Sequence, residues 1–153
     1  MKREQTKQIR ERQAAVLAAK CYLILDAIEA NVDDDRHRPI LALKRKGIGM
    51  ALAKNDVAAL TMAYRDARED VEALPPGDRA ELAHRLEATF GINIKDEIQG
   101  EIARSHLILR RGKIDNREEY SLLRVFIEQH ANRTDATLLD LAIRMVSAFE
   151  KTM

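Results

Sequence analysis

The most regular pattern in the chain is a set of six apolar residues that recur at alternating steps of three and four. They are Val57, Leu60, Tyr64, Ala67, Val71 and Leu74. This spacing makes one face of an α-helix apolar, whereas a half-buried β-strand alternates at every second residue. The sequence contains no stretch with that shorter period. The pattern therefore predicts a helix over about 56–74 that packs lengthwise against a neighbouring antiparallel helix.

The same helical period recurs along most of the 153 residues. It predicts further helices over about 5–31, 40–54, 78–90, 95–111, 116–132 and 134–149. The segment 14–28 is so rich in aliphatic side chains that we expect it to form a central helix with several neighbours. Connections of a few residues join these segments, which favours antiparallel packing of consecutive helices. The predicted fold is all-α: an antiparallel bundle of six or seven helices.

The strongest break in the helical pattern is the Pro-Pro-Gly sequence at 75–77. A chain of this length is expected to form a single domain, here a helical domain over 1–153. Pro75–Gly77 is then a candidate hinge between two sub-bundles, 1–74 and 78–153. Residues 1–12 carry few apolar side chains, so we expect them to project into solvent or to be disordered.

Cysteine content and hydropathy bear on the compartment of the protein. Cys21 is the single cysteine, so an internal disulfide cannot form and a reducing compartment is favoured. Lys20 interrupts the apolar run that follows the basic start, which argues against a cleaved leader. No run approaches the roughly 20 apolar residues of a membrane-spanning helix. We therefore expect a cytoplasmic protein without a membrane partner.

The stretch KRKGIGMALAKND, residues 44–56, combines three basic side chains with two closely spaced glycines. A phosphate-binding loop places its glycines between a strand and a helix, and no strand is predicted before Gly47. The favoured interpretation is that Gly47 and Gly49 let another helix approach closely, or that they break the helix. A contact with nucleic-acid phosphates and the binding of a nucleotide are the alternatives.

Candidate catalytic and metal-binding groups are sparse. Glu81 and His84 have the i, i+3 spacing of di-iron carboxylate bundles, but the chain has no second Glu-x-x-His. Cys21 lies on the apolar face of its helix, where an inert buried thiol is expected. We predict no catalytic residue, no cofactor and no metal site, and hence a protein that is not an enzyme. A metal-dependent enzyme built around Glu81 and His84 is the alternative hypothesis.

Two hypotheses for function come from different classes. The first is a non-catalytic helical module for protein–protein interaction, regulatory or adaptor in role and self-associating as a homo-oligomer. Its partner-binding residues would lie on the first helix and on the apolar face formed by Val57, Leu60, Tyr64 and Val71. The second is a nucleic-acid-associated regulator. Its contacts with phosphates would be made by Lys44, Arg45, Lys46, Arg110, Arg111 and Lys113.

Overall fold

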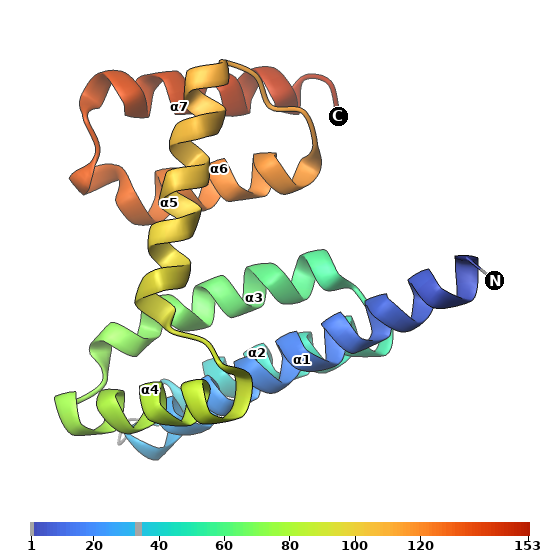
Figure 1. Cartoon of the computed structure of the whole chain (residues 1–153). Helices are drawn as coiled ribbons and strands as arrows, with labels where there is room; N and C mark the ends of the chain where they lie inside the picture. Colours follow the sequence, from blue (N-terminus) through green and yellow to red (C-terminus); the bar gives the residue numbers. More distant parts are fainter. Residues whose placement is uncertain (1, 33–34) are drawn as a thin grey trace. The chain divides into compact units, whose positions relative to one another are not determined.

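The computed structural model describes residues 2–32 and 35–153. Within these residues the chain forms seven α-helices and two short 3-10 helices, and no strand (Figure 1). Helix packing divides it into two compact units, Met1–Asn93 and Ile94–Met153. The all-α prediction is confirmed. The assignment of residues 1–153 to a single domain stays a prediction.

Among its described residues, the first unit consists of four α-helices and one 3-10 turn. They are α1 (Lys2–Ala30), α2 (Arg38–Ala53), α3 (Val57–Asp70), η1 (Val71–Ala73) and α4 (Pro76–Phe90). Consecutive α-helices run in opposite directions, so α3 follows the direction of α1 (Figure 1). Helix α1 packs against α2, α3 and α4, as expected for the aliphatic segment 14–28.

Small side chains on α1 allow this close packing. Ala14, Ala18, Cys21 and Leu25 recur at steps of four and three and are buried. The Sγ atom of Cys21 lies 4.0 Å from the carbonyl oxygen of Leu60 on α3. Burial raises the pKa of the Cys21 thiol to about 11, so the thiol stays protonated at neutral pH and is a poor nucleophile.

The connections of the first unit follow recognisable local chemistry. Asp56 begins α3 by accepting a hydrogen bond from the backbone N–H of Ala59 at 3.0 Å. Pro75 precedes α4, and Pro76 occupies its first turn, where proline is tolerated. Since α4 packs on α1, the boundary between the units lies at 93/94. The Pro75–Gly77 turn is therefore internal to the first unit, so the proposed hinge between 1–74 and 78–153 does not mark the boundary.

Among its described residues, the second unit contains α5 (Ile94–Arg111), α6 (Arg117–His130), η2 (Ala131–Arg133) and α7 (Ala136–Glu150). Gly112, with φ +77, ends α5, and Asn116 caps α6 by accepting from the N–H of Glu119 at 2.9 Å. Helix α6 packs against both α5 and α7. The core of this unit comprises Ile108, Leu109, Ile114, Leu122, Leu123, Phe126, Ala142, Met145 and Val146.

Candidate interaction surface

The residues that the sequence suggested for partner binding lie in the interior of the first unit. Leu60, Tyr64 and Val71 are buried, and Val57 is half-buried. Their face of α3 packs against α1, and α3 also contacts the antiparallel α2. Helical spacing predicted the apolar face correctly, but α1 covers it within the same chain. A partner of the folded protein would have to use another surface.

The basic group on α2 is largely engaged in ion pairs within the first unit. Lys44 pairs with Asp70 at the end of α3, with 3.0 Å between Nζ and Oδ2. Arg45 pairs with Asp26 and Glu29 of α1, both at 2.6 Å. Redirecting either cation to a phosphate would separate it from these carboxylates, so both are poorer phosphate ligands than their sequence cluster suggests.

Of the remaining basic residues that the sequence singled out, Lys46, Arg110 and Lys113 are exposed. Arg111 donates to the backbone carbonyl of Lys113 at 2.7 Å and pairs with Glu119. The hydrogen bond from Arg111 lowers the pKa of the Glu119 carboxyl. The two basic groups belong to different units. In each of these two basic groups, therefore, only some of the cations are exposed without a carboxylate partner that would compete with a polyanion.

The outer side of α2 is an exposed apolar surface that the sequence reasoning missed. The exposed fractions of its side chains are 51% for Ile40, 70% for Leu43 and 55% for Met50. Together with Gly47 these residues occupy about 80° of the helix circumference, and the centre of this stripe lies about 130° around the helix from the buried Leu41 and Ile48. We call Ile40, Leu43, Gly47 and Met50 the α2 outer face. The sequence did contain a sign of this surface. Residues 40–52 have apolar side chains on two sides of one helix, whereas an ordinary surface helix has a single apolar side.

Gly47 and Gly49 both lie inside the continuous helix α2, so neither breaks it. A Cβ atom at position 49 would lie 3.7 Å from the hydroxyl oxygen of Tyr22 on α1, which is an ordinary contact. A Cβ atom at position 47 would meet nothing within 4 Å. Glycine costs about 1 kcal/mol relative to alanine inside a helix. Packing within the first unit therefore gives no reason for glycine at 47.

Two mainly apolar grooves border the α2 outer face: one lies between α2 and α3, and the other lies where the end of α1, the start of α2 and the end of α3 meet. One has a volume of about 370 Å³ and is lined by Gly47, Ala63 and Met62 among others. The other has about 460 Å³ and includes Ile40. Both grooves reach Lys44. The apolar surface thus continues from the outer side of α2 toward α3.

A second surface of the first unit is basic and lies at the start of α1. Helix α1 has 29 residues whereas α3 has 14, and residues 2–13 are exposed. The positions that continue the core-facing side of α1 beyond Ala14 are Arg10, Lys7 and Arg3, at steps of four and three. Toward the start of α1 this stripe therefore changes from apolar and buried to cationic and exposed.

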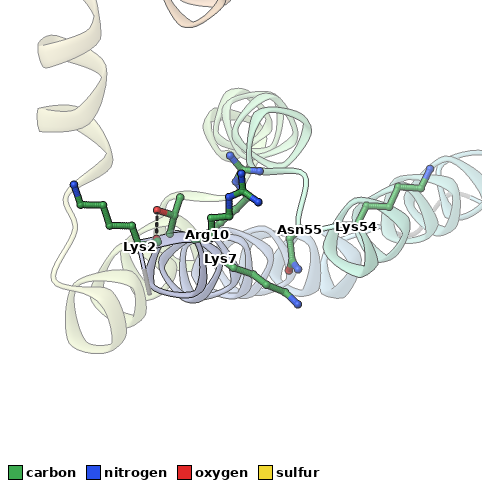
Figure 2. Close-up of a pocket in the computed structure, with 7 residues that line it drawn as sticks. Lys2, Lys7, Arg10, Lys54 and Asn55 are labelled. Atoms are coloured by element: carbon green, nitrogen blue, oxygen red, sulfur yellow. Dashed lines mark hydrogen bonds between the residues drawn. The ribbon is translucent and has the colours of Figure 1, made fainter.

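Figure 2 shows the cavity at this end of α1, which also reaches the connection between α2 and α3. Its volume is about 410 Å³, and its lining residues are Lys2, Arg3, Thr6, Lys7, Arg10, Lys54 and Asn55. No acidic side chain lines it. Within residues 2–32 and 35–153, none of the five cations forms an ion pair. These charges are available to an anion.

The groups that might support catalysis are dispersed. Glu81 and His84 lie on α4, and both are exposed. Across the described part of the chain, no three of the His, Cys, Asp and Glu residues gather so that they could hold a metal ion. His106 is half-buried and its ring meets Phe126 edge-on, with 5.7 Å between the centroids. That geometry agrees with a packing role for His106.

We predict that Gly47→Ala raises the stability of the dilute, monomeric chain by about 1 kcal/mol, because the added methyl group meets no neighbour and alanine is the better helix former. Urea unfolding followed by circular dichroism measures the change. Gly49→Ala, which adds the same group beside Tyr22, is the matched comparison. A loss of stability in Gly47→Ala would show that the monomer itself requires this glycine.

No helix among the described residues has both the length and the apolar content needed to cross a membrane. Comparisons with protein-family models, with curated proteins and with solved structures found no match to this chain.

Proposed function

We propose that this protein is a non-catalytic helical interaction module that self-associates through the α2 outer face. The observation that carries the proposal is the exposure of three large apolar side chains, Ile40, Leu43 and Met50, in one stripe of one helix. Single exposed apolar side chains are common on protein surfaces, whereas several that adjoin one another mark an interaction site. The neighbouring grooves enlarge the area that a partner helix could cover.

A regulatory or adaptor role in the cytoplasm accords with this proposal. The single cysteine, Cys21, is buried and its raised pKa keeps the thiol protonated, which suits a contact role better than a nucleophilic one. Other apolar side chains are exposed elsewhere, among them Leu107 on α5, with an exposed fraction of 61%. Leu107 therefore serves as a comparison of similar exposure outside the proposed surface.

We predict that Leu43→Glu abolishes self-association while Leu107→Glu does not. The wild-type chain, of 17.4 kDa, should show a mass that rises with concentration toward that of a dimer. Placing a carboxylate at position 43 removes an apolar contact worth about 2 kcal/mol in each copy and buries a charge. The loss from the two copies together, about 4 kcal/mol, should weaken the dimer by about a thousandfold. Sedimentation equilibrium measures the masses.

Two results would contradict this proposal. A wild-type chain that stays monomeric up to the highest soluble concentration has no self-associating surface. If Leu107→Glu lowers the mass and Leu43→Glu does not, association uses the second unit. Leu43 is exposed in the monomer, so both variants should retain the helical circular dichroism of the wild type.

A second candidate function is the binding of nucleic-acid phosphates, and the basic cavity at the start of α1 favours it. Five cations line this cavity (Figure 2), and the N-terminal end of a helix adds a partial positive charge. The sequence had placed such contacts at 44–46 and 110–113. Lys44, Arg45 and Arg111 pair with carboxylates, so the stronger support lies at Lys7 and Arg10.

We predict that Arg10→Glu weakens binding to a labelled single-stranded oligonucleotide more than Arg12→Glu does. Both variants change the net charge equally, but Arg12 does not line the cavity. In Arg10→Glu the dependence of log Kd on log salt concentration should also become shallower, by about one phosphate contact. Fluorescence anisotropy measures both quantities. Equal effects of the two variants, or no binding at low salt, would contradict this candidate function.

A further inference from the structure

The cations that α1 contributes to the basic cavity lie on one side of the helix, apart from its carboxylates. They are Lys2, Arg3, Lys7 and Arg10, and they occupy about 140° of the helix circumference. Glu4 and Glu11, the acidic residues of this exposed segment, lie outside that arc. The row from Lys2 to Arg10 is about 12 Å long. A single phosphate group cannot contact both of its ends, whereas about 12 Å of a B-DNA axis carries roughly three or four phosphates of each strand.

The connection between α2 and α3 forms another part of the cavity. It contributes Lys54 and Asn55, and in Figure 2 Asn55 lies between the cations of α1 and Lys54. Backbone hydrogen bonds hold Asn55 in place. Its N–H donates to the carbonyl of Leu52 at 3.0 Å, and its carbonyl accepts from the N–H of Val57 at 3.1 Å.

The side chain of Asn55 is half-buried and lines the cavity. Within residues 2–32 and 35–153 its amide forms no hydrogen bond. An asparagine amide has two N–H donors. Because the backbone of Asn55 is fixed, these donors are available to a ligand in the cavity without a rearrangement of the connection.

The lining of the cavity suits phosphate oxygens better than bases. Lysine binds phosphate as a point charge, and arginine can donate to two phosphate oxygens at once. None of the described residues that line the cavity is aromatic, although aromatic stacking is the usual way to bind the bases of a single strand. Contacts with phosphates position a nucleic acid but carry no sequence information directly.

We infer that the basic cavity holds several consecutive phosphates of one nucleic-acid strand and does not read its bases. The α2–α3 connection shares in this binding: Lys54 supplies a charge, and the amide of Asn55 donates to a phosphate oxygen. The inference rests on the second candidate function and adds the part of the nucleic acid that is bound and two binding residues outside α1. It distinguishes a cavity built from two segments from a basic helix end that would bind alone.

Two variants of the connection test these roles. Asn55 has φ +51, which glycine adopts readily, so Asn55→Gly removes the amide and keeps the backbone. It should weaken binding to a labelled oligodeoxythymidine about tenfold, through the loss of a hydrogen bond to a charged group, and leave the salt dependence of Kd unchanged. Lys54→Gln should weaken binding and also lower the slope of log Kd against log salt concentration by about one phosphate contact. Fluorescence anisotropy measures both quantities.

Lys46→Gln is the matched control, because Lys46 is exposed on α2 and does not line the cavity. It should bind as the wild type does. If Asn55→Gly or Lys54→Gln binds as tightly as this control while Arg10→Glu binds more weakly, that residue holds no phosphate. The inference is then overturned and the candidate function stands. If the wild-type chain binds no oligonucleotide at low salt, both fall.

A competition experiment tests which part of the nucleic acid is bound. Inorganic polyphosphate, which has consecutive phosphates and no bases, should displace the labelled oligonucleotide from the wild-type chain. Unlabelled oligonucleotides of equal length and different sequence should displace it equally well. If polyphosphate does not compete, or if one sequence is strongly preferred, the chain contacts bases or sugars and the inference is overturned, while nucleic-acid binding itself stands.

Discussion

The packing of α1 against three helices determines which surfaces of the first unit are left uncovered. Its small residues, among them Ala14, Ala18 and Cys21, allow α2 and α3 to approach closely. The inner sides of both helices are thereby buried. Helix α1 is also much longer than α2 and α3. Among the described residues of the first unit, the apolar outer side of α2 and the cationic start of α1 are two surfaces that its own helices leave exposed.

Most of the fold could be predicted from the sequence because aliphatic spacing and capping residues are local signals. The central helix was readable in this way, and so were the helices predicted over about 56–74 and 116–132, which Asp56 and Asn116 cap in the structure. The boundary between the units was not, because the Pro75–Gly77 turn is a strong local break whether or not the next helix packs back. Helix α4 returns to α1, and this contact between distant residues leaves no local mark.

The candidate site was harder to predict for the same reason. Spacing shows that Leu60 and Tyr64 share an apolar face, but it does not say whether a helix of the same chain or of another chain covers that face. Likewise, Lys44 and Arg45 are basic neighbours in the sequence, while their carboxylate partners come from α1 and α3. Gly47 differs from these residues. The basic and apolar residues around Gly47 were visible in the sequence. Only the three-dimensional structure shows that a side chain at position 47 would meet no neighbouring atom.

The central claim is that the outer side of α2 is uncovered in one chain and covered in the associated form. Amide hydrogen exchange at low and high protein concentration, resolved by peptide mass spectrometry, tests it most directly. The account predicts that exchange over residues 40–50 slows as concentration rises, while exchange over residues 117–130 of α6 does not change. Exchange in α2 that is independent of concentration, or protection that develops in α6 instead, would contradict it.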